Sequence, residues 1–358
     1  MIQYLLNKIT YALLTLWGVV TVIFFLFNVL PGDPAQMMLG QNEDSEQLAL
    51  VKQKYGFDKS ATTQYLYYLN DLSPLSFHSQ KPEDYTFLNK DKYNAIALFS
   101  IGSITTALKT PYLRESFTKQ GKKVTQVLAE TLPNTFVLAI TAIIIAIIVG
   151  LLLGIVSALF KDRWLDKTIQ VISTLGMSVP SFFSAILFAW VFGFVLHKYT
   201  NLEMTGSLFE LDDFGETMHV KWKNLILPAI VLGIRPLAVV IQLMRNSLLE
   251  VFNQDFIRTA RAKGLSEFQI IRRHAVKNAL NPVVTAISGW FASMLAGAVF
   301  VEYIFGWNGL GKEIVNALNT LDLPVIMGAV LVIATLFVMI NILVDLIYVW
   351  LDPKVKLQ

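Results

Sequence analysis

Long apolar runs with few or no charges constrain the fold of this chain more than any other feature. Six of them reach the roughly 20 residues that an α-helix needs to cross a bilayer, at about 9–30, 133–160, 169–196, 225–249, 282–301 and 324–350. Only 15% of the 358 residues are charged, whereas a soluble domain has about a quarter. The sequence therefore predicts an all-α integral membrane protein with six transmembrane helices.

The distribution of Lys and Arg predicts how these helices are oriented, because short cytoplasmic loops are enriched in basic residues. Basic residues gather in loops 161–168 and 250–281 and in the tail 352–358, which six spans place on one side. We therefore expect both termini to be cytoplasmic. The run 94–108 is too short to span a bilayer, and we expect it to be interfacial or part of a folded loop.

These features predict the organisation of the chain. Residues 1–30 form a first transmembrane helix, since their apolar run is longer than that of a signal peptide. Residues 31–130 form an extracytoplasmic segment. Residues 131–351 form a core of five transmembrane helices, which includes the cytoplasmic loop 250–281, and residues 352–358 form a cytoplasmic tail.

The stretch 255–280, DFIRTARAKGLSEFQIIRRHAVKNAL, is basic and looks soluble. Its pattern predicts that the fourth span continues as a helix to Lys263, with Gly264 in a left-handed conformation after its end. Ser266 and Gln269 then form a capping box for a second helix, whose apolar face holds Phe268, Ile271, Ala275 and Ala279. Such a hairpin is either a basic helix resting on anionic lipid or a docking element for a cytoplasmic partner.

The core of this stretch resembles a known loop. Residues Thr259, Ala260, Arg261, Ala262, Lys263, Gly264, Leu265 and Ser266 read T-A-R-A-K-G-L-S. This is similar to the cytoplasmic "EAA" loop of ABC importer permeases, in the version of the oligopeptide/dipeptide permease family. The general EAA pattern has glutamate and alanine where this chain has Arg258 and Thr259, departures that the peptide branch shares.

Other motifs support the same resemblance along nearly the whole chain. After the first span, Pro31, Gly32, Asp33 and Pro34 are similar to the L-P-G-D-P-A motif of the family. The sequences S-V-P-S-F at 178–182 and L-P-A at 227–229 also match. Segment 75–115 is longer than is usual for the family, so the resemblance assigns it no role.

The resemblance implies a type I ABC importer permease in the bacterial inner membrane, with multiple spans in lipid. It implies four partners: a second homologous permease, two cytoplasmic ATP-binding subunits and an extracytoplasmic solute-binding protein. The implied cargo is peptides or related small solutes. ATP is then bound by the partner subunits, and we expect no cofactor, no catalysis by this chain and no nucleic-acid partner. The alternative is a secondary transporter or channel subunit that is not coupled to ATP.

Motifs for chemistry are weak in this sequence. The run 306–312 fits G-x-x-x-x-G-K, but Glu313 stands where a phosphate-binding loop needs Ser or Thr for magnesium. The four histidines have no metal-ligand spacing, and the chain contains no cysteine. We therefore predict no ATP site and no metal site.

Two charged residues in or near the spans are candidates for the translocation pathway. Arg235 lies near the middle of the fourth span, where an arginine is costly unless it faces a cavity or a partner. Glu302 follows the fifth span and could line the same cavity. Small residues recur at Gly150 and Gly154, and again at 289, 293 and 297. Such stripes serve close helix packing, either within the chain, against a second permease or along the pathway.

Overall fold

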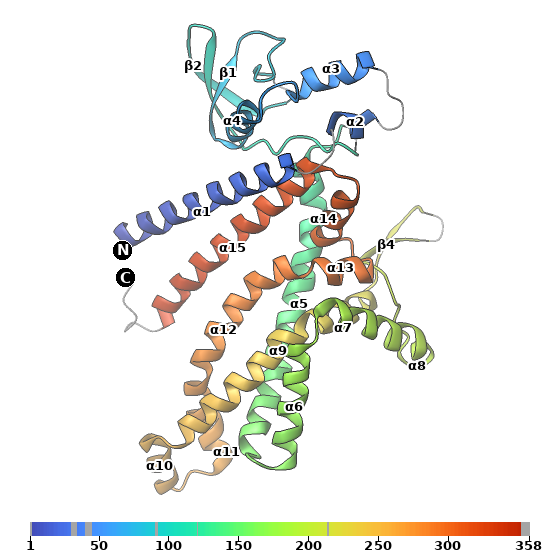
Figure 1. Ribbon diagram of the computed structural model, residues 1–358. Coiled ribbons are helices and arrows are strands. Elements are labelled where there is room, and N and C mark those ends of the chain that lie inside the picture. Colours follow the sequence, from blue (N-terminus) through green and yellow to red (C-terminus); the bar gives the residue numbers. More distant parts are fainter. Residues whose placement is uncertain are drawn as a thin grey trace. The chain divides into compact units, whose positions relative to one another are not determined.

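The computed structural model describes residues 2–29, 34–39, 45–89, 92–119, 121–212 and 215–351. These residues are mostly helical, as expected (Figure 1). The chain divides into two compact units. Unit 1 comprises Met1–Glu130 and Ile314–Thr335, and unit 2 comprises Thr131–Glu313 and Leu336–Gln358.

Unit 1 begins with the long apolar helix α1 (Ile2–Val29), which is followed by shorter helices and a small sheet. The helices are α2 (Pro34–Leu39), α3 (Ser45–Tyr55) and α4 (Ala61–Leu72), and the strands are β1 (Leu75–Ser79), β2 (Ala95–Ile101) and β3 (Ile104–Lys109). The sheet is antiparallel in the order β1-β3-β2. The run 94–108 therefore belongs to a folded hairpin, one of the two expected forms, although its strands were not expected. A separate apolar cluster in unit 1 joins α1, α4 and the start of α15 (Leu323–Leu351) through Val20, Phe24, Tyr68 and Met327.

Unit 2 holds most of the remaining helices. They are α5 (Val124–Leu159), α6 (Trp164–Ser178), α7 (Ser181–Phe188), η1 (Ala189–Val195), α8 (His197–Thr200), α9 (Lys223–Phe252), α10 (Asp255–Ala262), α11 (Glu267–Ile270), η2 (Ile271–Ala275), α12 (Val276–Gly297), α13 (Val299–Phe305), α14 (Leu310–Asn319) and α15 (Leu323–Leu351). A two-stranded hairpin, β4 (Phe209–Leu211) and β5 (Met218–Val220), precedes α9. Helices α5, α14 and α15 each cross a boundary between the units.

Among the described residues, five helices are long and apolar enough to cross a membrane, and a bent pair could supply a sixth span. The bent pair corrects the prediction of one continuous third span: α6 and the helix that follows it meet at 108°. The break lies at Val179 and Pro180. Val179 adopts an extended conformation, as residues before proline do, and Pro180 has no amide hydrogen to continue the ladder.

Pro133 and Pro282, at which the second and fifth spans were expected to begin, lie inside helices. Helix α5 begins at Val124, before Pro133, and the helix that contains Pro282 begins at Glu267. These two helices therefore begin before the predicted spans, so the apolar run marks only part of each helix. Membrane helices tolerate internal proline because neighbouring groups satisfy the freed carbonyl, so proline was a poor marker of a helix end here.

The small residues of α5 pack against α9. A Cβ atom at Gly150 would lie 2.7 Å from Val240 Cγ1, and one at Gly154 would lie 2.7 Å from Met244 Cβ. Both distances are shorter than carbon atoms allow, so each glycine permits a close approach of the two helices. This pair of glycines forms a packing face within the chain, one of the readings that the sequence left open.

Candidate coupling site and membrane cavity

The predicted coupling loop begins with a break between α9 and α10. Helix α9 ends at Phe252, and Gln254 is extended. The Asn253 side chain donates to the carbonyl oxygen of Leu249 at 3.0 Å. This bond satisfies one carbonyl of the last turn. The expectation of a continuous helix from the fourth span to Lys263 is therefore wrong: α10 is a separate helix.

The turn after α10 has the predicted geometry. Gly264 has φ +77°, a left-handed conformation that favours glycine. Its amide donates to Arg261 O at 2.9 Å and the Leu265 amide donates to Ala260 O at 3.3 Å. These are the two bonds of a Schellman motif. The capping box is also confirmed: Ser266 Oγ accepts from the Gln269 amide, and Gln269 Oε1 accepts from the Ser266 amide.

An ion pair spans this turn. Arg261 Nε donates to Glu267 Oε1 at 2.8 Å, and Arg261 Nη2 donates to Glu267 Oε2 at 3.3 Å. Both side chains are exposed, so the pair contributes little to stability. Its two-point geometry nevertheless limits how α11 can turn relative to α10.

The inner face of the hairpin is anchored to the body of unit 2. Ile257, Ala260 and Ile270 are buried in one cluster with Met244 and Leu248 of α9. Fixing α10 and α11 against α9 in this way makes the hairpin a rigid extension of that helix. The expectation that Ala260 packs where the two helices meet is confirmed.

The apolar stripe beyond the turn differs from the predicted one. The buried residues are Ile270, Ala275, Ala279 and Val283. Phe268 is 69% exposed. The reason is the π-helical segment Ile271–Ala275, in which one extra residue is inserted into the turn. The spacing from Ile270 to Ala275 is therefore five, and the inner face starts at Ile270 instead of Phe268.

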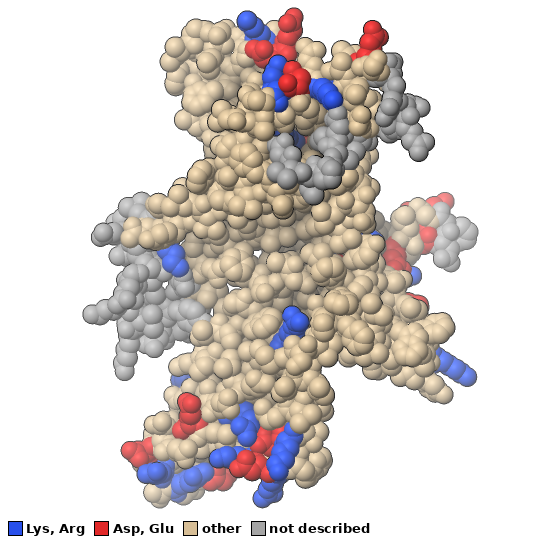
Figure 2. Space-filling model, in the orientation of Figure 1, with Lys and Arg blue, Asp and Glu red and all other residues tan. Residues whose placement is uncertain are grey.

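The outer face of the hairpin combines apolar and charged side chains. Phe256 and Phe268 are its exposed aromatic residues, and Arg258, Arg261 and Lys263 are also exposed. Figure 2 shows blue and red side chains gathered at the end of unit 2 that carries α10 and α11, next to a tan surface over the long helices. This end is built for an aqueous or protein environment.

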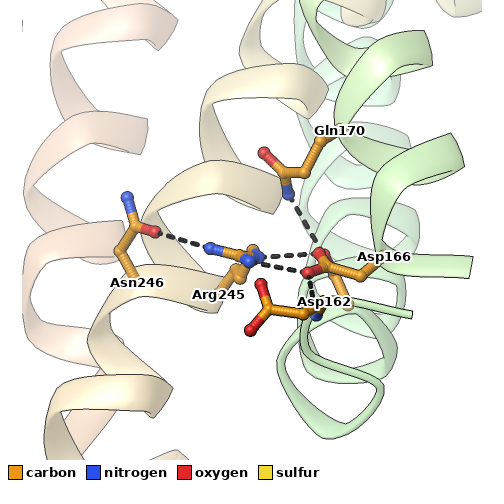
Figure 3. Close-up of polar contacts among 6 residues, drawn as sticks. Asp162, Asp166, Gln170, Arg245 and Asn246 are labelled. Carbon is orange, nitrogen blue, oxygen red and sulfur yellow. Dashed lines mark hydrogen bonds and ion pairs between the residues drawn. The ribbon is translucent and has the colours of Figure 1, made fainter. Parts of the chain in front are cut away.

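A buried ion pair that the sequence analysis missed lies near this end (Figure 3). Arg245 of α9 donates through Nε and Nη2 to the two carboxylate oxygens of Asp166 at 2.7 and 2.6 Å. Ser157 Oγ and the Asp162 amide also donate to Asp166. The cluster joins α5, α6 and α9. The sequence analysis considered only the basic residues of loop 161–168 and so overlooked Asp166. An acidic residue in the first turn of a helix is favoured by the helix dipole, and this could have drawn attention to it.

Arg235 faces a small cavity, as expected for a charge within a span. Its Nη2 lies 3.5 Å from the carbonyl oxygen of Val179, at the break between α6 and α7. Both residues line a cavity of about 90 Å³, together with Trp290, Ser293 and Gly297 of α12. The cavity is therefore bounded by the broken span, α9 and α12.

Comparison with known proteins decides the family. The family model described as "Binding-protein-dependent transport system inner membrane component" matches residues 150–357. The model for the N-terminal part of such membrane components matches residues 1–80. The chain belongs to this family. It is the permease subunit of an ABC importer, a multi-pass inner-membrane protein and not an enzyme.

Named relatives match nearly the full length of the permease. It is 32% identical to the dipeptide transport system permease protein DppB of Alkalihalophilus pseudofirmus, over 99% of this chain and 100% of the relative. It is 29% identical to the probable D,D-dipeptide transport system permease protein DdpB of Escherichia coli, over 94% and 93%. An inward-facing structure of the MetNI methionine ABC transporter matches 62% of this chain and 94% of its own, with a TM-score of 0.49 and 18% identity.

Glu302 of the permease does not reach the cavity of Arg235. Its side chain is fully buried, and Oε2 accepts from the amides of Gly311 and Lys312 at 2.6 and 3.3 Å. These amides lie in the first turn of α14, where a carboxylate is favoured. A Cβ atom at Gly309 would lie 2.4 Å from the same oxygen. Contrary to what the sequence had suggested, Glu302 therefore does not line the cavity of Arg235, and it instead holds α13 against α14.

The small residues of α12 that the sequence analysis singled out are exposed. Gly289, Ser293 and Gly297 are exposed on α12, and no atom lies within 4 Å of a Cβ placed at either glycine. This stripe is not a packing face among the described residues of the permease.

The family motif after the first span lies mostly outside the described residues: Pro31, Gly32 and Asp33 are not described, and Pro34 begins α2. Within the described part of the chain, no cluster of His, Asp or Glu could hold a metal ion.

Proposed function

We propose that this permease pairs with a second homologous permease and carries peptides or related small solutes, with energy from two cytoplasmic ATP-binding subunits. A solute-binding protein outside the membrane delivers the cargo. The peptide class is supported by the names of the relatives, which describe dipeptide and D,D-dipeptide transport. The family description supports a binding protein as a partner.

The observation that carries this proposal is the hairpin of α10 and α11. Its inner face is locked to α9, and its outer face presents Phe256 and Phe268 to the surroundings. A rigid, capped element with exposed aromatic residues suits docking into a groove on a partner protein. Because α9 also carries Arg235, movement of the hairpin by the ATP-binding subunits would move one wall of the cavity.

The exposed stripe of α12 supports a second permease. Thr285, Gly289, Ser293 and Gly297 repeat every four residues and are all exposed. Within a membrane, small side chains allow another helix to approach closely. The stripe also meets the cavity of Arg235, which Ser293 and Gly297 line. A partner helix here would complete a pathway between the two permeases.

ATP-driven uptake tests the proposal. The purified complex is reconstituted in liposomes with its binding protein, and uptake of a radiolabelled dipeptide is measured. We expect uptake only with ATP on the side of the ATP-binding subunits, since we predict that ATP is bound by those subunits and not by this chain. Uptake that follows a proton or sodium gradient without ATP would contradict the proposal and favour the secondary transporter.

A further inference from the structure

Unit 1 contains a cavity that the transport mechanism does not use. Its volume is about 600 Å³, within the range of small-molecule sites. The walls come from the end of α3, from the loop at residues 82–89, from Lys92 and from residues 112–117. Residues 81–149 fall outside both family models. The cavity therefore depends on a part of the chain to which the family models assign nothing.

The floor of the cavity is held in place by Asp71 of α4, which is 1% exposed. Its carboxylate accepts from Tyr85 Oη at 2.8 Å, Tyr93 Oη at 2.9 Å and Arg114 Nε at 3.0 Å. Tyr85 and Arg114 line the cavity. A fully bonded buried carboxylate fixes these side chains before any ligand arrives, which lowers the cost of binding.

Lys92 gives this wall a partly buried cation. Its Nζ donates to the carbonyl oxygen of Tyr85 at 3.0 Å and lies 3.6 Å from the centre of the Tyr85 ring. No described carboxylate forms an ion pair with Lys92: Asp71 pairs with Arg114, and Asp71 and Glu115 act on Lys92 only through space. Burial lowers the pKa of the Lys92 amine to about 8. The amine is still mostly protonated at neutral pH, and an anion beside it would raise its pKa again.

Another part of the lining is aromatic. Tyr55, Phe57 and Phe117 form a cluster with ring centres 5.8 to 6.1 Å apart, and all three line the cavity. Among the exposed lining residues are the carboxylates Glu83 and Asp84 and one cation, Lys54, so their net negative charge would repel a second negative charge on a ligand. Glu115 lines the wall and acts on Lys92 only through space. The arrangement favours a single negative charge inside and an apolar body next to it.

We propose that this cavity binds a small organic monocarboxylate with an aromatic or other apolar body. The carboxylate pairs with Lys92, and the apolar body packs against Tyr55, Phe57 and Phe117. The site lies within the extracytoplasmic segment that the charge distribution predicts, and it does not depend on which solute the permease transports.

Saturation-transfer NMR on the purified full-length permease in nanodiscs tests this site. The probes are N-acetyl-L-phenylalanine and its uncharged amide. We expect the acid to bind and the amide to bind at least about tenfold more weakly, the loss typical of one charge-assisted hydrogen bond. Lys92→Gln should weaken binding of the acid by a similar factor. Lys81 is an exposed lysine outside the cavity, so Lys81→Gln should leave binding of the acid unchanged.

Three results would overturn the proposal: no saturable binding of the acid, equal binding of the amide, or equal binding of the acid to Lys92→Gln. If Lys92→Gln is not recovered as folded protein, Phe57→Ala decides, since it removes part of the aromatic wall and leaves Lys92 and Asp71 in place. Loss of acid binding in the Phe57→Ala variant supports the site, and unchanged acid binding refutes it. Transport is not measured, so this outcome is independent of the proposed function.

Discussion

Three charged side chains of unit 2 differ in burial and in their partners, and these differences set what each residue can do. Asp166 has Arg245, Ser157 and a backbone amide around it. Glu302 has the amides at the start of α14. Arg235 instead has one long contact to a carbonyl oxygen and an open cavity. Of these residues, Arg235 is therefore the one that remains available to a passing solute.

Removing the charge of Asp166 should destabilise the permease. Asp166→Asn leaves Arg245 largely buried without its anion, which costs about 3 kcal/mol, and the thermal unfolding midpoint in detergent should fall clearly. Asp255→Asn is the matched control, because the Asp255–Arg258 pair is exposed and such pairs contribute little. The double variant Asp166→Leu with Arg245→Met should recover stability. A midpoint that is equal in both single variants would contradict this reading.

Arg235→Leu should preserve assembly but lower dipeptide uptake. If the guanidinium makes one charge-assisted hydrogen bond to the peptide in transit, its loss corresponds to about a tenfold effect. Arg235→Lys keeps the charge and should retain more uptake. The measurement is uptake in liposomes, normalised to the recovered complex. Normal uptake by the leucine variant would reduce Arg235 to a structural role.

At the scale of elements, the hairpin of α10 and α11 is defined by two local devices. The Schellman turn at Gly264 and the capping box at Ser266 set the entry angle of α11. Because of the π-helical segment Ile271–Ala275, the buried face of the second helix starts at Ile270, and Phe268 is exposed on the outer face. Together they decide which side chains a partner meets.

Gly264→Val should prevent docking of the ATP-binding subunits without affecting membrane insertion. No atom lies within 4 Å of a Cβ at this position, so the effect comes from backbone strain of about 1–2 kcal/mol. Gly264→Asn is the matched control, since asparagine tolerates the left-handed conformation. Recovery of ATP-binding subunits with the purified permease should fall for valine and persist for asparagine. Equal recovery would indicate a helix that only rests on lipid.

The sequence predicted the turn but not the register beyond it. Gly264, Ser266 and Gln269 are local signals, because each acts on backbone within a few residues. The π-helical segment has no such signal, since its extra residue is stabilised by packing of Ile270 and Ala275 against α9. The break at Val179 was readable from Pro180, but the apolar run around it concealed the bend.

At the scale of the whole chain, composition predicted a membrane protein, and the family comparison agrees. Composition did not predict the sheet of unit 1. Its strands put Ser76 and His78 inside and leave Leu75 and Phe77 exposed. This inverts the usual pattern, so an alternation of apolar residues could not show which face is buried. The polar cluster around Asp71 depends on contacts between residues 71 and 114, which no local pattern reveals.

The central claim is that residues 255–280 of the permease bind the ATP-binding subunits. The most direct measurement is photo-crosslinking in membranes from a benzoylphenylalanine placed at position 268, on the outer face of the hairpin. Position 199 is the control, because Tyr199 is as exposed as Phe268 but lies on α8. We predict an adduct with an ATP-binding subunit from position 268 and none from position 199. No adduct from position 268, or equal adducts from both positions, would contradict the account.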